Sequence, residues 1–141
     1  MVARRILVVC SGNTCRSPMA AALLQRLRGH AVEVESAGID SGEGLPATKE
    51  AVSVMKDMGI DISRHHSRDI ANVDLAGFDF FLAMTTTIAE QLRQSGVDVA
   101  KIKQMNVSDP YHKGIDVYRS TANDIENQLR RLFADSSGDH F

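Results

Sequence analysis

The sequence is poor in cysteine, proline and aromatic residues, and it contains no tryptophan. Its 141 residues include two cysteines, Cys10 and Cys15, three prolines and 5% aromatic residues. A small secreted domain held together by disulfides carries more cysteines, and they are spaced further apart. The two cysteines therefore exclude a disulfide framework and indicate chemistry at one site.

Long apolar stretches and clusters of basic residues are missing as well. Residues 6–9 form an apolar run after a basic start, but a signal peptide needs about 7 to 15 apolar residues there. No stretch approaches the roughly 18 apolar residues of a membrane span. The formal net charge is −2, and no segment gathers the lysines and arginines that bind nucleic acid. We therefore expect a soluble, cytoplasmic protein that binds neither membranes nor nucleic acid.

The composition that remains is that of an ordinary globular domain, with 43% hydrophobic and 24% charged residues. A chain of this length fits one domain, since single domains most often hold roughly 100 to 150 residues. Residues 134–141 show no strand or helix pattern. We expect a single domain over residues 1–133 and a flexible C-terminal tail over residues 134–141.

Four segments predict strands, and a helical pattern follows each of them. The strands are predicted at residues 5–10, 32–36, 78–84 and 102–105, and the helices at residues 17–28, 47–58, 86–94 and 117–132. Ser17 and Asp116 are predicted to cap helices, with Pro18 at the first helical position. This alternation predicts an α/β fold, a doubly wound four-stranded parallel sheet with helices on both faces. Its ligand crevice should lie beyond the carboxyl ends of the strands.

The loop between the first predicted strand and helix has the features of a phosphate-binding loop. It follows Cys10 and consists of Ser11, Gly12, Asn13, Thr14, Cys15, Arg16 and Ser17. A loop that enters a helix N-terminus presents backbone N–H groups to an anion. Gly12 and Asn13 tolerate the left-handed backbone that would turn those groups inward. The planar guanidinium of Arg16 can bind two phosphate oxygens at once.

Cys10 and Asp109 are candidates for bond-forming and proton-transfer chemistry. The helix N-terminus and Arg16 favour the thiolate of Cys10, which is the nucleophilic form. Asp109 precedes Pro110 in a stiff loop after the last predicted strand, so it should lie at the same sheet edge and protonate the leaving group. Ser17 is placed to hydrogen-bond the sulfur. This set predicts that phosphomonoesters are hydrolysed through a phosphocysteine.

The segment C-S-G-N-T-C-R-S-P at residues 10–18, followed by Asp109-Pro110-Tyr111, resembles the low-molecular-weight protein tyrosine phosphatase family. The resemblance covers nearly the whole chain in length and element order. It implies a protein tyrosine phosphatase with Cys10 as nucleophile, Arg16 as phosphate ligand and Asp109 as acid and base. It also implies a network that holds the loop, made of Asn13, Ser17, Ser36 and either His65 or His66.

The substrate is a phosphorylated protein on this interpretation, and inorganic phosphate or another oxyanion should bind in the loop. Tyr111 offers an aromatic wall, so we favour phosphotyrosine. Thr14, and the lack of an aromatic residue between positions 37 and 46, resemble the bacterial protein-arginine phosphatases of the same family. Phosphoarginine is therefore the alternative. No metal or cofactor is predicted, because no cysteine or carboxylate partners His65 and His66 at ligand spacing.

Two other functions are an arsenate reductase and a phosphate-binding module without catalysis, and Cys15 has two possible roles. An arsenate reductase of this fold needs a relay of further cysteines, and the chain has none beyond Cys15. A phosphate-binding module without catalysis would have no use for a thiolate or for Asp109. Cys15 is either a small buried residue or the partner of Cys10 in a reversible disulfide.

Overall fold

A four-stranded parallel sheet organises residues 3–133, the part of the chain that the computed structural model describes. The strands are β1 (Arg4–Cys10), β2 (Val32–Gly38), β3 (Phe80–Ala83) and β4 (Ile102–Gln104). They lie in the order β2-β1-β3-β4, and every pairing is parallel. The predicted fold is confirmed, with some strand ends shifted by one or two residues. The predicted tail lies outside the described residues.

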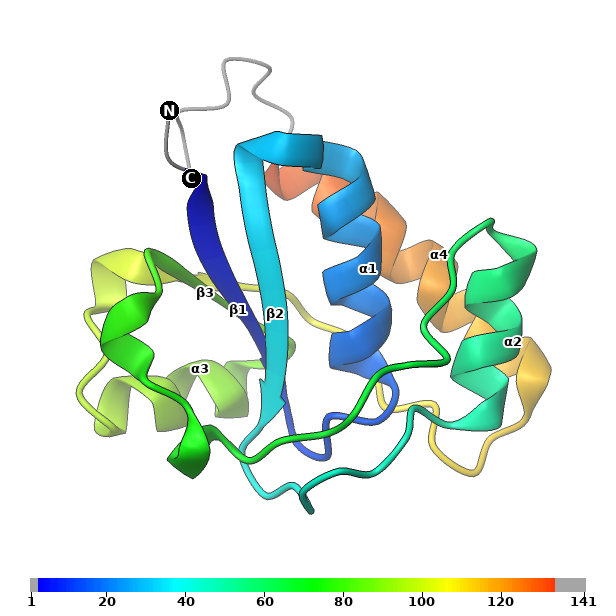
Figure 1. Cartoon of the computed structure of the whole chain (residues 1–141), viewed down its shortest axis with the longest axis horizontal. Helices are drawn as coiled ribbons and strands as arrows, with labels where there is room; N and C mark the ends of the chain where they lie inside the picture. The colour runs from blue at the N-terminus through cyan, green and yellow to red at the C-terminus, as the bar shows by residue number, and fades with distance from the viewer. Residues whose placement is uncertain (1–2, 134–141) are drawn as a thin grey trace.

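Helices cover both faces of the sheet. The α-helices are α1 (Arg16–Arg28), α2 (Lys49–Asp57), α3 (Thr86–Gln94) and α4 (Ile115–Leu132), and the short 3-10 helices are η1 (Gly29–Ala31), η2 (Ile70–Asn72), η3 (Leu75–Gly77) and η4 (Val99–Lys101). Helices α1, α2 and α4 lie on one side of the sheet and α3 on the other (Figure 1). Along residues 3–133, no helix has both the length and the apolar character to cross a bilayer.

Strand β1 is buried on both faces, which explains its unbroken apolar run. Ile6 and Val8 point into the core shared with α1, α2 and α4, whereas Leu7 and Val9 point into the core shared with α3. Residues 6–10 are at most 1% exposed. Such a strand has no solvent face, so its sequence shows no alternation of apolar and polar residues. Burial from both sides holds Cys10 rigidly at the strand end.

Both predicted helix caps, Ser17 and Asp116, are wrong. Helix α1 begins at Arg16 with Cys15 in the capping position, so Ser17 and Pro18 lie within its first turn. The loop supplies this start, and the Ser17 hydroxyl is used elsewhere. Helix α4 begins at Ile115 after Gly114, and Asp116 pairs with Arg119 at 3.2 Å instead of capping the helix.

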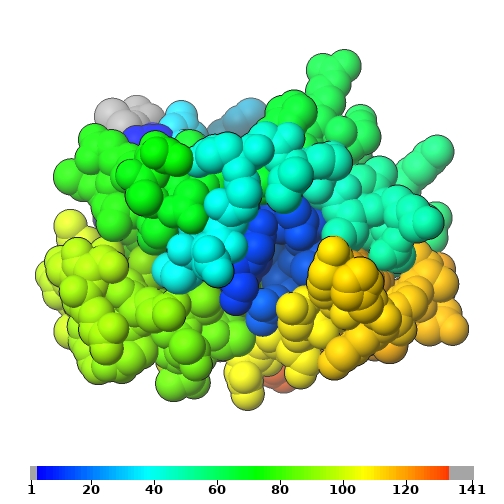
Figure 2. All heavy atoms as spheres, turned by 90° about the horizontal axis from the view of Figure 1, so that it is seen from below, coloured from blue at the N-terminus to red at the C-terminus, as the bar shows by residue number. Residues whose placement is uncertain are grey.

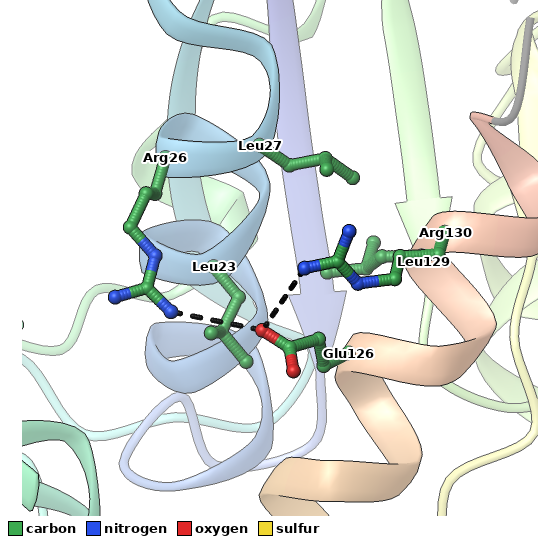
Figure 3. A pocket seen from close by; sticks show the side chains of 6 residues that line it. All are labelled: Leu23, Arg26, Leu27, Glu126, Leu129 and Arg130. Carbon is green, nitrogen blue, oxygen red and sulfur yellow. Dashed lines mark ion pairs between the residues drawn. The ribbon is translucent and has the colours of Figure 1, made fainter. Parts of the chain in front are cut away.

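Helix α4 supports the outer face of α1. Figure 3 shows the Glu126 carboxylate between Arg26 and Arg130, beside leucines of both helices. The two ion pairs measure 3.6 and 3.8 Å. Pairs this exposed contribute about 0 to 1 kcal/mol each, so apolar burial dominates this contact. The packing fixes α1, whose N-terminus carries the loop after β1.

Candidate active site

The loop between β1 and α1 turns its carbonyl oxygens outward. Five consecutive carbonyls accept hydrogen bonds from surrounding groups: Cys10 from Ile39 N (2.9 Å), Ser11 from Asp40 N (3.1 Å), Gly12 from Ser41 Oγ (2.9 Å), Asn13 from His65 Nε2 (2.7 Å) and Thr14 from Thr48 N (2.9 Å). A trans peptide directs its N–H opposite to its carbonyl. The N–H groups of this loop therefore face its centre. One of them, from Asn13, donates to Cys10 Sγ at 3.3 Å.

Asn13 is the residue that makes this curvature possible. It is fully buried and has a φ of 57°, in the left-handed region that asparagine tolerates better than most residues. The predicted left-handed backbone is thus confirmed for Asn13. Gly12 does not have a positive φ. If Gly12 carried a Cβ, the nearest atom to it would be Thr14 Oγ1, at 3.8 Å.

The amide of Asn13 orients the hydrogen bonds around the Cys10 sulfur. Arg68 N can only donate, and it lies 3.0 Å from Asn13 Oδ1. The amide nitrogen of Asn13 therefore faces the other way and donates to Ser17 Oγ at 2.8 Å and to Ser36 Oγ at 2.9 Å. The Ser17 hydroxyl proton is then available for Cys10 Sγ, 2.9 Å away. Two donors, Asn13 N and the Ser17 hydroxyl, thus converge on the Cys10 sulfur.

Gly38 lets the loop approach the neighbouring strand closely. It pairs with Cys10 in the register of β1 and β2. A Cβ at this position would lie 2.6 Å from Ser11 O and 2.6 Å from Ser41 Cβ. Any side chain would therefore push the loop away from β2.

Arg16 presents one edge of its guanidinium to the loop. The side chain is buried, and Nη1 donates to Val107 O at 3.1 Å. Among the described residues, Arg16 Nε has no hydrogen-bond partner. Nη2, which points in the same direction as Nε, is 3.7 Å from Asp109 Oδ2. Nε is therefore available to an anion, and Nη2 can bind a second anion oxygen by giving up its contact with Asp109.

Asp109 lies at the mouth of the loop, next to both Arg16 and Cys15. Its side chain is 51% exposed, and Oδ1 accepts from Tyr111 N at 3.1 Å and from Cys15 Sγ at 3.6 Å. Tyr111 is half exposed and its ring packs on His112, with centroids 3.8 Å apart. Pro110, which lies between Asp109 and Tyr111, is buried and stiffens this segment. A carboxyl group thus lies beside Arg16 and Cys15 and within reach of solvent.

The loop forms the floor of a depression. In Figure 2, the blue surface of the β1 to α1 segment is recessed between the cyan segment that follows β2 and the yellow to orange segment before α4. These three segments meet at the carboxyl ends of the parallel strands, where α/β sheets bind ligands. The sequence predicted the site at this edge.

A sequence profile described as "Low molecular weight phosphotyrosine protein phosphatase" matches residues 5–139. The chain belongs to the low-molecular-weight protein tyrosine phosphatase family. A relative named "Protein-arginine-phosphatase", from Geobacillus stearothermophilus, is 37% identical over 91% of this chain and 93% of its own length. Another, "Probable low molecular weight protein-tyrosine-phosphatase EpsP" from Ralstonia nicotianae, is 37% identical over 87% of this chain and 89% of its own length.

Solved structures agree with these sequence matches. The low molecular weight protein tyrosine phosphatase from T. tengcongensis has a TM-score of 0.85 and 36% identity, covering 94% of this chain and 99% of its own. A YwlE arginine phosphatase, described as a cysteine-to-serine mutant with a phosphorylated active site serine, has a TM-score of 0.82 and 30% identity over 96% of this chain and 97% of its own. The family thus includes relatives named for two different phosphoamino acids.

The structure brings together the site residues that the family resemblance implied. Arg16 pairs with Asp109, and Asn13, Ser17 and Ser36 form one hydrogen-bonded network that reaches the Cys10 sulfur. Of the two neighbouring histidines, His65 contacts the loop, whereas His66 is exposed and pairs with Pro46 through its backbone. Within residues 3–133, no group of three or more histidine, cysteine, aspartate or glutamate side chains is arranged to hold a metal ion.

Several contributors were missed by the sequence interpretation. They are Gly38, Ser41, Thr48, Arg68 and Val107. Three of them act through backbone atoms, which no side-chain pattern reveals. A glycine at the end of a strand was the one available signal, since it often marks a close approach of two backbones.

Burial shifts the titration of two groups around the loop. It raises the pKa of Cys15 to about 12, with the nearby Asp109 carboxylate as the second cause. It also lowers the pKa of His65 below its usual value. At neutral pH the Cys15 thiol is therefore protonated, and His65 is more often neutral than an exposed histidine. Its Nε2 carries the proton, because it faces the Asn13 carbonyl.

Proposed function

We propose that this phosphatase-family chain hydrolyses phosphorylated protein side chains through a phosphocysteine on Cys10. The observation that carries the proposal is the Nε of Arg16, which is buried without a hydrogen-bond partner among the described residues. A buried donor left unpaired costs about 1 to 3 kcal/mol. A phosphate in the loop would accept from Nε, from Nη2 and from the inward N–H groups at once.

The first step transfers the phosphoryl group to sulfur. The Cys10 thiolate attacks phosphorus from the base of the loop, and the bond from phosphorus to the leaving oxygen breaks on the opposite side. Asp109 donates its carboxyl proton to that oxygen. The loop amides and Arg16 stabilise the charge on the equatorial oxygens during transfer.

The second step releases phosphate. The Asp109 carboxylate takes a proton from water, whose oxygen attacks phosphorus while the Cys10 thiolate leaves. The hydrogen bond from Ser17 supports the thiolate as it leaves. One carboxyl group thus serves as acid and then as base, as its position at the mouth permits.

Phosphotyrosine is the first candidate substrate. Tyr111 is half exposed and follows Asp109 directly, so its ring can lie against an aromatic leaving group. Stacking of this kind contributes about 0.5 to 1.5 kcal/mol. The family description and the relative from Ralstonia nicotianae support the same substrate.

Phosphoarginine is the second candidate, and Thr14 is the observation that favours it. Thr14 belongs to the loop that would hold the phosphate, and its hydroxyl lies near Gly12, 3.8 Å from the position of a Cβ there. A hydroxyl there would suit the nitrogen of a phosphoramidate better than an aliphatic side chain would. The relative from Geobacillus stearothermophilus, named as an arginine phosphatase, supports this candidate.

Rates on matched phosphotyrosine and phosphoarginine peptides separate the two candidates. We expect a higher kcat/KM on phosphotyrosine, and we expect Thr14→Ile to leave that activity largely intact. A preference for phosphoarginine of more than about tenfold, or about 1.4 kcal/mol in transition-state binding, would reverse the assignment. If Thr14→Ile then lost the activity on phosphoarginine, the preference would be assigned to Thr14.

A simple aryl phosphate tests the proposal of hydrolysis itself. Wild-type protein should hydrolyse it, with inorganic phosphate as a competitive inhibitor, and Asp109→Ala should lose about 10² to 10⁴ in rate on substrates with basic leaving groups. A chain that binds phosphate without turnover would be a binding module instead. We also propose a cytoplasmic location, because reducing conditions keep a cysteine nucleophile free. Both cysteines are free in the structure.

A further inference from the structure

Arg68 is held to strand β2 and to the active-site loop at the same time. Its Nε donates to Ser36 O at 3.1 Å, and its Nη2 pairs with Glu35 Oε1 at 2.5 Å. Its backbone N–H donates to Asn13 Oδ1 at 3.0 Å. The side chain therefore fixes the segment from which the backbone N–H reaches Asn13.

Glu35 is itself anchored by a second arginine. Its Oε2 accepts from Arg5 Nη2 at 2.6 Å, and Arg5 Nη1 donates to Gly77 O at 2.8 Å. Burial alone would raise the pKa of Glu35, but the hydrogen bonds from Arg5 and Arg68 outweigh it and lower the pKa. Glu35 is therefore ionised at neutral pH. The chain of contacts runs from β1 across β2 to the segment that carries Arg68.

We propose that Glu35 and the Arg68 side chain are positioning residues that aim the Asn13 amide and thereby favour the Cys10 thiolate. The direction of the network depends on Arg68 N, because this donor keeps Asn13 Oδ1 facing it. Only in that orientation does the Asn13 amide nitrogen reach Ser17. If the segment moves, Ser17 loses the partner that orients its hydroxyl toward the sulfur.

The pair is suited to positioning more than to stability. The side chains of Glu35 and Arg68 are 36% and 34% exposed, and ion pairs with such exposure contribute about 0 to 1 kcal/mol. Truncating either one should leave the protein folded. Its effect should therefore be seen in the chemistry of Cys10.

The sign of the effect separates positioning from simple electrostatics. Removing a negative charge near a sulfur favours the thiolate through space. Loss of the hydrogen bond that Ser17 donates to Cys10 would instead disfavour the thiolate. Glu33 provides the matched control, because it lies on the same strand and is 3.8 Å from Arg5 Nε. Within the described part of the chain, the ion-pair partner of Arg68 is Glu35 and not Glu33.

The test compares Glu35→Ala, Arg68→Met and Glu33→Ala with wild type. Alkylation of Cys10 by iodoacetamide is followed against pH by peptide mass spectrometry, and aryl phosphate kinetics are measured in parallel. Cys15 interferes little near neutral pH, because its pKa is raised to about 12. Thermal unfolding confirms that each variant is folded.

We expect Glu35→Ala and Arg68→Met to move the alkylation profile to higher pH. At neutral pH, alkylation and kcat should each fall by about threefold to tenfold with KM nearly unchanged, since one charge-assisted hydrogen bond is misaligned. The double variant should be no worse than Arg68→Met alone, because that change already breaks the contact between Glu35 and Arg68. Glu33→Ala should match wild type.

An alkylation profile for Glu35→Ala that matches Glu33→Ala, or that moves to lower pH, would overturn the inference. The inference rests on the proposed function only for its kinetic readout. Wild-type protein that fails to hydrolyse aryl phosphate would refute the proposed function, while the alkylation profile would still decide the role of Glu35 and Arg68.

Discussion

Arg16 donates through Nη1 to the carbonyl of Val107 at 3.1 Å, although 91 positions separate the two residues. The contact connects the start of α1 to the segment that leads to Asp109. It also occupies Nη1, so that Nε stays without a partner among the described residues while Nη2 lies 3.7 Å from Asp109 Oδ2. The phosphate ligand and the proton donor are therefore positioned by one interaction.

Arg16→Lys should reduce kcat/KM on aryl phosphate by about 10² to 10³, the loss typical of removing one donor to a developing charge. Lysine keeps the positive charge but cannot contact Val107 and two phosphate oxygens together. Arg26→Lys on the exposed side of the same helix is the control, and its kinetics should be unchanged. Similar activity in the two variants would argue against bidentate binding by Arg16.

Asn13→Asp should lower both stability and activity. The carboxylate cannot donate to Ser17 and Ser36, and it buries a negative charge beside the Cys10 sulfur. An unsatisfied buried group of this kind costs about 1 to 3 kcal/mol, and more when charged. Urea unfolding and kcat check the prediction. Asn123→Asp on the exposed face of α4 has the same chemical change and should behave as wild type.

The sequence was sufficient to predict strand β1, the loop after it and the sheet edge where Asp109 lies. A strand buried on both faces leaves a continuous apolar run, and a loop that binds an anion needs small residues, asparagine and arginine. These requirements are local, so they can be read from residues 5–18. Prediction failed where tertiary contacts replaced local ones.

Ser17 and Arg68 illustrate that difference. Serine before proline is a common start for a helix, yet the Ser17 hydroxyl binds the Cys10 sulfur, and Cys15 takes the capping position. Arg68 contributes its backbone N–H across 55 positions. A backbone donor has the same chemistry in every residue except proline, so its role depends on the folded chain alone.

His65 should make stability depend on pH in mildly acidic solution. Burial lowers the pKa of His65 in the folded protein, so the unfolded chain binds its proton more readily, near the usual value of about 6.5. The free energy of unfolding should therefore decrease as the pH falls through about 6.5 toward the lowered pKa. Urea unfolding at a series of pH values measures this slope.

The His65→Gln variant should show a smaller slope, because glutamine does not titrate but keeps an N–H group for the Asn13 carbonyl. His66→Gln should reduce the slope much less, since it removes only a small contribution of His66 to the lowered pKa of His65, whose main cause is burial. A slope that is reduced by His66→Gln and not by His65→Gln would refute the assignment.

Cys15 should protect Cys10 from irreversible oxidation. Peroxide converts the Cys10 thiolate to a sulfenic acid, and the Cys15 sulfur then displaces water to form a disulfide. Asp109 Oδ1, 3.6 Å from Cys15 Sγ, can accept the thiol proton. Wild type treated with peroxide should recover activity in dithiothreitol, whereas Cys15→Ser should not. Full recovery of that variant would remove the protective role.

Trapping the phosphoryl group on sulfur tests the central claim most directly. Asp109→Ala should still transfer phosphate from an aryl phosphate with a good leaving group, which needs no proton, but should hydrolyse the intermediate slowly because no base activates water. Acid quenching during turnover, followed by peptide mass spectrometry, should find the phosphoryl group on Cys10, and Cys10→Ser should show no turnover. A phosphoryl group on another residue, or turnover by Cys10→Ser at a rate near wild type, would contradict the phosphocysteine mechanism.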